Sequence, residues 1–181
     1  MLFALFASRK LLPLAIVAVL VPGATMGAFA YVRSQASAIP PIHDVSTNWD
    51  DPIRLSDSLL AARGPEANPV LDAPTAPDRA PWAGKTVAVL NAEHCPGARP
   101  IPRSVDSDRV AEVLEDMGLA IHGRAPWRVE ATAESFWYGF KDDVVVRIRP
   151  DRTDVRSISR VGVSDLGANC KRVTEILQRL Q

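Results

Sequence analysis

Residues 127–180 decide the fold, and they read WRVEATAESFWYGFKDDVVVRIRPDRTDVRSISRVGVSDLGANCKRVTEILQRL. Three alternations of apolar and polar residues predict strands, around Val129–Ala133, Asp142–Arg149 and Thr153–Val161. An apolar stripe then recurs every three or four residues, which is typical of a helix docked on a sheet. That stripe consists of Leu166, Cys170, Val173, Leu177 and Leu180.

The connections in this stretch predict its register and its final helix. Pro150-Asp151-Arg152 indicates a tight turn. With Asp151 and Arg152 as the two loop residues, Ile148 pairs with Val155, and Arg147 lies beside Arg156. Ser164 is expected to cap the final helix, with Asp165 in its first turn.

Residues 99–126 supply a second helix. Its apolar stripe is Val110, Val113, Leu114 and Met117, its cap is Asp106 or Ser107, and Gly118 ends it. Arg99–Val105 is expected to be an edge strand because two prolines exclude it from a sheet centre. A short strand at Leu119–His122 and a turn at Gly123–Pro126 follow. Residues 99–181 therefore predict an α+β domain, an antiparallel β-meander with two packed helices.

The N-terminus predicts a membrane segment. An uncharged run over residues 11–32 follows Arg9 and Lys10, and in a helix it matches the roughly 30 Å hydrocarbon core of a bilayer. The basic flank favours a cytoplasmic N-terminus. Residues 1–33 thus indicate a single-pass anchor in a bacterial inner membrane, with a periplasmic soluble part. A cleaved signal peptide is the alternative, with Ala28-Phe29-Ala30 as its cleavage site.

The region between anchor and domain is rich in proline, with eleven of the fifteen prolines between residues 39 and 102. We expect residues 34–98 to form a proline-rich spacer or arm. Ser56–Arg63 predicts one short helix capped by Ser56. Val87–Leu90 is too short a run to assign to helix or strand.

Composition argues against several classes of function. The 21 basic and 21 acidic residues balance, so no positive field favours nucleic acid. The sequence contains no CxxC or HExxH pattern. His43-Asp44 and His94-Cys95 lack the spacing of a metal site, and no cofactor is expected.

A set of acids and arginines is the main candidate for chemistry. A ligand site for a carboxylate or phosphate is one interpretation, because the planar guanidinium fits both. A partly buried ion-pair network is the favoured alternative. The candidate residues are Arg147, Arg156, Arg160, Glu130, Asp142 and Asp143, with Arg149 beside them.

Two further features leave alternatives open. Phe136–Phe140 is interpreted as core packing or a tight turn, or else as an exposed face that meets a membrane or a partner. Cys170 lies on the apolar stripe and is favoured as a buried thiol, while a Cys95–Cys170 disulfide fits an oxidising compartment.

Three motifs carry a resemblance to the family called domain of unknown function 1499. They are IHDVST at 42–47, FWYGFKDDVVVR at 136–147 and VRSISRVGVSDLGAN at 155–169. The resemblance implies a bacterial envelope, membrane-attached or plastid protein with this α+β fold, and it implies no particular activity. Cys170 departs from the family pattern, which usually has a small residue there. Several relatives also have more than one membrane span.

These observations favour a membrane-anchored envelope protein whose exported domain binds a partner or an anionic or lipid ligand. The competing hypothesis is an enzyme, hydrolase-like or of another class, that uses Glu130, Asp142 or Asp143 as a general base beside Arg147 and Arg156. A purely structural scaffold is the third hypothesis.

Overall fold

The computed structural model describes residues 12–181, apart from the side chains at positions 35 and 36, and divides at residue 39 into two compact units. In the first unit, α1 (Leu12–Ser37) is a continuous helix with Pro22 inside it. Its segment Leu12–Ser34 is long and apolar enough to cross a membrane, a test that a signal sequence also passes. Arg9, Lys10 and Leu11, on which part of the membrane prediction depends, lie outside the described residues.

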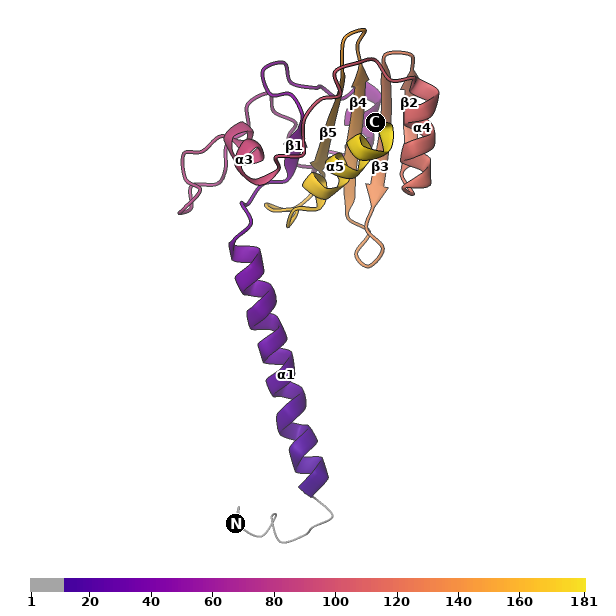
Figure 1. The fold of residues 1–181 in the computed structure, drawn as a ribbon. Coiled ribbons are helices and arrows are strands. Elements are labelled where there is room, and N and C mark those ends of the chain that lie inside the picture. Colours follow the sequence, from indigo (N-terminus) through magenta and orange to yellow (C-terminus); the bar gives the residue numbers. More distant parts are fainter. Residues whose placement is uncertain (1–11) are drawn as a thin grey trace. The chain divides into compact units, whose positions relative to one another are not determined.

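The second unit, residues 40–181, is built on a five-stranded antiparallel sheet in the order β1-β5-β4-β3-β2 (Figure 1). The strands are β1 (Asp44–Ser46), β2 (Ala120–Ala125), β3 (Arg128–Glu134), β4 (Lys141–Ile148) and β5 (Thr153–Ser159). The four helices of this unit are α2 (Asp57–Arg63), α3 (Val87–His94), α4 (Ser107–Asp116) and α5 (Ala168–Leu180). The α+β class and the antiparallel meander are confirmed.

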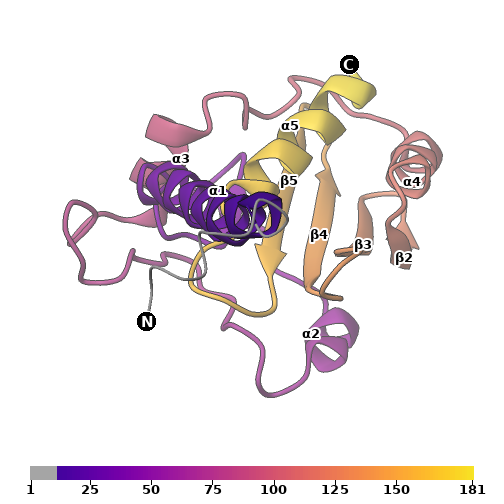
Figure 2. The same ribbon diagram turned by 90° about the horizontal axis from the view of Figure 1, so that it is seen from below.

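The two faces of the sheet differ in chemistry. The apolar face packs Val129, Val144 and Val155 against α4 and α5, where Leu114 and Ile176 are fully buried. The opposite face, here called the charged face, carries Glu130, Asp143, Arg147, Asp154 and Arg156. Residues 49–72, including α2, cover it, and α2 and α5 accordingly lie on opposite sides of the sheet (Figure 2).

The β4–β5 register differs from the predicted one. Arg147 pairs with Asp154, and Val146 pairs with Val155. The loop therefore has four residues, 149–152, closed by a hydrogen bond from Arg149 N to Arg152 O at 2.8 Å. This register replaces the predicted Arg147–Arg156 neighbours with an opposite-charge pair, which is the more stable arrangement across two strands.

Several element boundaries also differ. The predicted turn at Gly123–Pro126 is largely strand, because β2 continues to Ala125 past an irregularity between Ile121 and Gly123. The predicted strand at Arg99–Val105 is reduced to an isolated bridge between Ile101 and Thr153. The edge strand next to β5 is instead β1.

The final helix begins later than predicted. Gly167, at φ +85°, precedes its first residue, Ala168. The Asp165 carboxylate, rather than Ser164, accepts from the amides of Gly167 (2.7 Å) and Asn169 (3.1 Å). Leu166 lies before the helix and is exposed, and Ile176 is buried with the helix stripe instead.

The predicted spacer is part of the compact unit from Pro40 onward. Ile53, Leu55 and Leu59 pack on Val145 and Ile158 of the sheet. The helix predicted at Ser56–Arg63 is present, and Ser56 caps it through Leu59 N. The unassigned run at Val87 begins a helix, α3. The prolines interrupt the apolar periodicity that would have predicted helices or strands in this region, but they do not prevent its side chains from being buried.

Candidate functional site

Arg156 lies at the centre of the charged face and is fully buried. It donates to both carboxylate oxygens of Asp44, from Nε at 3.0 Å and from Nη2 at 2.5 Å. It also donates to the carbonyls of Ile53 (2.7 Å) and Leu71 (2.8 Å), and the Trp49 ring lies 5.2 Å from its guanidinium carbon. Its charge is balanced by Asp44, and its donors are largely occupied.

Asp143 forms a second buried centre, between two arginines. Arg63 of α2 donates to it at 2.6 Å, and Arg160 donates to both of its oxygens at 3.0 and 2.8 Å. Thr132 Oγ1 donates at 2.8 Å. Burial lowers the pKa of Arg63, and the negative charge of Asp143 opposes that shift.

Arg147 and Glu130 are also engaged with the covering segment. Arg147 donates to Asp154 at 3.1 Å and to the carbonyl of Asp51 at 2.9 Å. The hydrogen bond from Arg149 holds the pKa of Asp51 below its ordinary value, and the positive charge of Arg147 adds to that effect. Glu130 accepts from the backbone N–H of Ser56 at 2.8 Å and from its hydroxyl, so it fixes the start of α2.

Asp142 does not join the other candidates. It lies on the apolar face, where Arg172 of α5 donates to it at 2.8 Å. The same guanidinium reaches Ser157 and Asn169, which form a small polar group under the start of α5. The six candidate residues therefore fall on two faces of the sheet.

The partners of these residues were missed by sequence reasoning. They come from segments distant in the chain or from positions that periodicity does not mark: Asp44, Asp51, Arg63, Asp154 and Arg172. One signal was present, because Asp44 belongs to the IHDVST motif. A buried arginine on β5 requires a buried acid, and that motif contains one.

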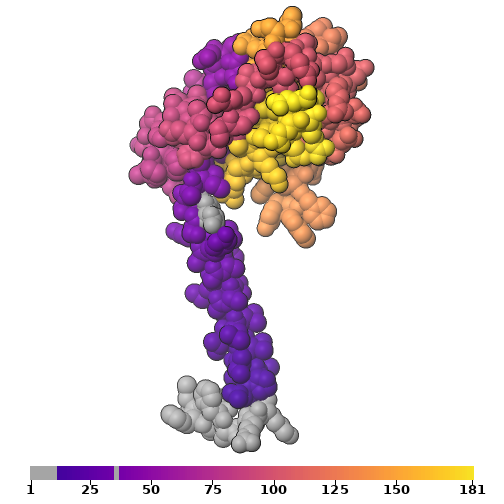
Figure 3. All heavy atoms as spheres, viewed as in Figure 1, coloured from indigo at the N-terminus to yellow at the C-terminus, as the bar shows by residue number. Residues whose placement is uncertain are grey.

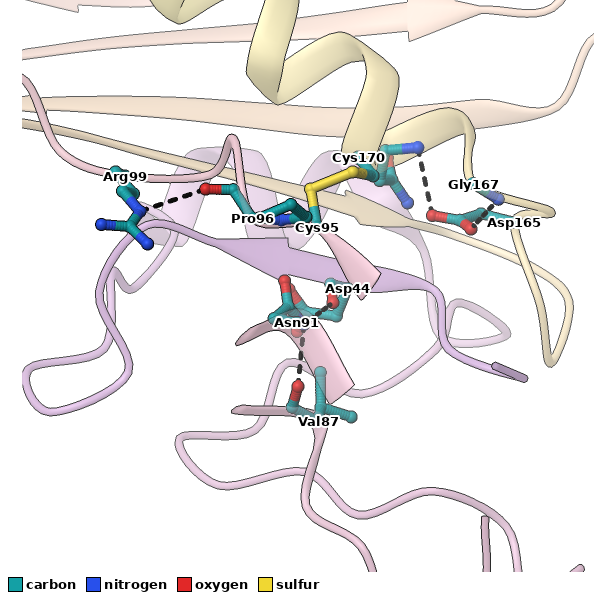
Figure 4. Close-up of a disulfide and its surroundings, with 10 residues drawn as sticks. Asp44, Val87, Asn91, Cys95, Pro96, Arg99, Asp165, Gly167 and Cys170 are labelled. Atoms are coloured by element: carbon teal, nitrogen blue, oxygen red, sulfur yellow. Dashed lines mark hydrogen bonds between the residues drawn. A yellow bond between two sulfur atoms is a disulfide. The ribbon is translucent and has the colours of Figure 1, made fainter. Parts of the chain in front are cut away.

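Cys95 and Cys170 form a disulfide with Cα atoms 5.7 Å apart, which joins the end of α3 to α5 (Figure 4). Asn91 of α3 donates to the carbonyls of Asp44 (3.1 Å) and Val87 (2.9 Å). The favoured interpretation of Cys170 as a buried thiol is therefore wrong, and the alternative disulfide is present. The bonded sulfurs offer no thiolate for nucleophilic or metal chemistry. Within residues 12–181, no three potential ligands among His, Cys, Asp and Glu are grouped to hold a metal ion.

The β3–β4 hairpin carries four exposed aromatic side chains, three of which are the most exposed large apolar side chains of the second unit. Exposure is 89% for Phe136, 84% for Trp137, 78% for Tyr138 and 54% for Phe140. The β5–α5 loop adds Val161, Val163 and Leu166, all exposed. We call these seven residues the apolar end. The interpretation of the aromatic run as core packing is therefore wrong, while its interpretation as a tight turn is right, because residues 136–138 form the turn between β3 and β4. The expected exposure is present, and contact with a membrane or a partner stays a prediction.

Comparison with known proteins gives one family. A family model described as "Protein of unknown function (DUF1499)" matches residues 44–180, most of the chain. The comparisons with curated proteins and with solved structures gave no match.

Proposed function

The chain belongs to the family described as protein of unknown function (DUF1499), and from that premise we propose a membrane-anchored binding protein without catalytic activity. Its unit of residues 40–181 works outside the cytoplasm, in the periplasm if the cell has one. The observation that carries the proposal is the pairing of Arg147, Arg156, Arg160, Glu130, Asp142 and Asp143 within the protein. Because these charges are paired inside the protein, we expect a partner or ligand to bind at the exposed surface. The apolar end is the most distinctive part of that surface.

Two observations support membrane anchoring and export. The segment Leu12–Ser34 has the length and hydropathy of a membrane span. The Cys95–Cys170 disulfide lies in the second unit, and disulfides persist in oxidising compartments such as the periplasm. A cytoplasmic location would expose the same cysteines to reducing conditions.

The enzyme hypothesis has less support. A general base must be free to take a proton, yet Asp143 is surrounded by Arg63, Arg160 and Thr132 and is fully buried. Glu130 is likewise buried against Ser56. A ligand would have to displace residues 49–72 to reach either carboxylate.

Membrane attachment and export are tested on the full chain in its native membrane. We expect the protein to resist alkaline extraction, and we expect both cysteines to be blocked to thiol reagents until a reductant is added. Release into the soluble fraction would refute the anchor. Free thiols in freshly trapped cells would refute export.

Binding through the apolar end is tested by a photo-crosslinking residue placed at Phe136 in cells. Trp127 is the matched control, because it is 66% exposed at the opposite end of β3. We expect adducts to protein or lipid from position 136 and few from position 127. Equal labelling of both positions would contradict the proposal.

A further inference from the structure

Hydrogen bonds within the β3–β4 hairpin fix its backbone, so that its aromatic side chains point away from the body of the unit. Ser135 N donates to Phe140 O at 2.8 Å, Gly139 N donates to Ser135 O at 2.9 Å, and Phe140 N donates to Ser135 Oγ at 2.9 Å. Gly139 has φ +63°, a conformation that favours glycine. The rings therefore project from a closed loop, and the hairpin protrudes from the body of the unit (Figure 3).

The aromatic rings of the hairpin form two contacting pairs. Phe136 and Trp137 meet edge to face with centroids 5.0 Å apart, and Tyr138 stacks on Phe140 at 5.5 Å. Aromatic side chains remove a large apolar area from water when they are buried. Four of them exposed on one hairpin amount to a surface suited to contact with another apolar phase.

The second loop of the apolar end leaves the sheet beside the hairpin. Arg160 N donates to Lys141 O at 2.9 Å, which joins the end of β5 to the start of β4. Val161, Val163 and Leu166 follow directly along the chain. The apolar residues of both loops therefore lie at one end of the sheet.

The chain enters the unit at this same end. Ser159 N donates to His43 O at 2.8 Å, and Asp165 N donates to Ile42 O at 2.9 Å. The candidate span ends at Ser34, and Pro40, the first residue of the unit, is buried. Six residue steps reach about 20 Å at most when fully extended. With the span in a bilayer, a tether of this length keeps this end of the unit near the membrane surface.

We propose that the apolar end is a second membrane contact, in which the β3–β4 hairpin enters the interfacial layer of the bilayer that holds α1. The inference rests on the anchor of the proposed function and names the lipid surface as what the apolar end binds. Trp and Tyr are enriched at the headgroup level of membranes, because their rings are apolar and their N–H or O–H groups are polar.

The charge around the hairpin indicates which lipids are sufficient for the proposed contact. Lys141 and Glu134 flank it, with Nζ and Oε2 3.8 Å apart, so the base of the hairpin has no net charge. The contact therefore depends on apolar burial rather than on attraction to anionic lipid. It forms on neutral bilayers and persists at high salt.

The test uses the full chain reconstituted in neutral phosphatidylcholine vesicles. Trp137→Cys and, separately, Trp127→Cys are labelled with an environment-sensitive fluorophore, while Cys95 and Cys170 remain bonded to each other. Trp127 precedes β3 and the hairpin follows it, so the labels lie on the order of 20 Å apart along the strand. Lipids brominated near the headgroup serve as quenchers.

We expect the label at position 137 to shift to the blue and to be quenched several-fold more than the label at 127, equally at low and high salt. Equal quenching at both positions overturns the inference. Quenching that appears only with anionic lipid overturns the apolar mechanism. A photo-crosslink from position 136 to a second copy or to another protein, without any lipid adduct, also overturns it.

A second variant keeps the test independent of folding. In the Tyr138→Cys protein, Phe136→Ser and Trp137→Ser together should abolish quenching at position 138. The thermal unfolding midpoint should stay unchanged, because both side chains are exposed. Alkaline extraction of the same vesicles reports on the anchor separately. An anchored protein without quenching contradicts only the second contact, whereas an extracted protein contradicts the proposed function.

Discussion

On one face of the sheet, Val129, Val144 and Val155 are buried against the regular helices α4 and α5. On the other face, Glu130, Asp143 and Arg156 are buried beneath residues 49–72, whose only regular element is the seven-residue α2. Both faces exclude water, yet they use different interactions. Apolar contact is non-directional and follows the period of each strand. Buried charge needs particular partners at particular distances.

The difference shows how a segment with little secondary structure can be held on a sheet. Such a segment leaves its backbone carbonyls without helix or strand partners. Arginines of the charged face supply the missing donors. Arg156 bonds Ile53 O and Leu71 O, Arg147 bonds Asp51 O, and Arg160 bonds Ala62 O. The guanidinium groups therefore neutralise acids and also fix the path of the covering chain.

The largest effect is expected from Arg156→Ala. It leaves the Asp44 carboxylate buried without its counter-charge and frees two carbonyls of the covering segment. Removing one partner of a buried pair costs about 3–5 kcal/mol. Urea unfolding of the full chain in detergent, followed by circular dichroism, should show a loss of this size.

A double-mutant cycle sharpens this prediction. Asp44→Asn alone should also destabilise, but Asp44→Asn combined with Arg156→Ala should lose less than the sum of the two single changes. Additive losses would mean that the two side chains do not stabilise each other. If Arg156→Ala unfolded at the same urea concentration as the native protein, the buried charges would not stabilise the charged face. The contrast between the two faces would then have no basis.

The disulfide should have the next largest effect. Cys95 and Cys170 are 75 positions apart, and both contact the apolar cluster. Closing a loop of that length constrains the unfolded chain, so Cys95→Ser with Cys170→Ser should cost about 2–4 kcal/mol. Reduction of the native protein should shift the unfolding midpoint equally. A midpoint insensitive to reductant would show that the apolar face needs no covalent link.

The apolar face was predictable from the sequence, and the charged face was not. Val144, Val146 and Ile148 alternate, and Val110, Val113 and Leu114 follow the helical period. The strand, the helix and the side chains that face the core could therefore all be predicted. Arg156 and Asp143 were identified as candidates, but their partners Asp44 and Arg63 lie 112 and 80 positions away. No local period encodes such a pairing, and a four-residue loop shifted the predicted register as well.

A smaller effect is expected at Asp165, at the start of α5. Burial raises the pKa of this carboxyl, and the amides of Gly167 and Asn169 oppose the shift. Because the folded pKa lies above the unfolded value, the folded state binds more protons just above pH 3.8, and this group's contribution to stability falls as pH rises. The free energy of unfolding of Asp165→Asn should therefore rise relative to that of the native protein as the pH increases from 4 to 7, by about 1 kcal/mol or less.

The matched control for Asp165 is Asp106→Asn. Asp106 also caps a helix, α4, through the amides of Asp108 (2.8 Å) and Arg109 (3.3 Å), but it is exposed. Urea unfolding of both variants at several pH values separates burial from capping, because both carboxylates accept helix amides and only that of Asp165 is largely buried. The same pH dependence in both variants would assign the effect to helix capping rather than to burial.

The smallest effect on the free energy of unfolding is expected from Arg54→Ala. This variant removes an ion pair that lies on the same covering segment but is exposed, so it tests charge without burial. Arg54 donates to Asp72 at 2.6 Å, as short a contact as many on the charged face, but the two side chains are 77% and 53% exposed. Exposed pairs contribute little to stability because water and salt screen them. Urea unfolding should therefore barely change, and added salt should remove the remaining difference. The bond from Arg128 to the Arg54 carbonyl is a backbone contact and survives the substitution. A loss comparable to that of Arg156→Ala would mean that the covering segment depends on its surface charges as much as on its buried ones.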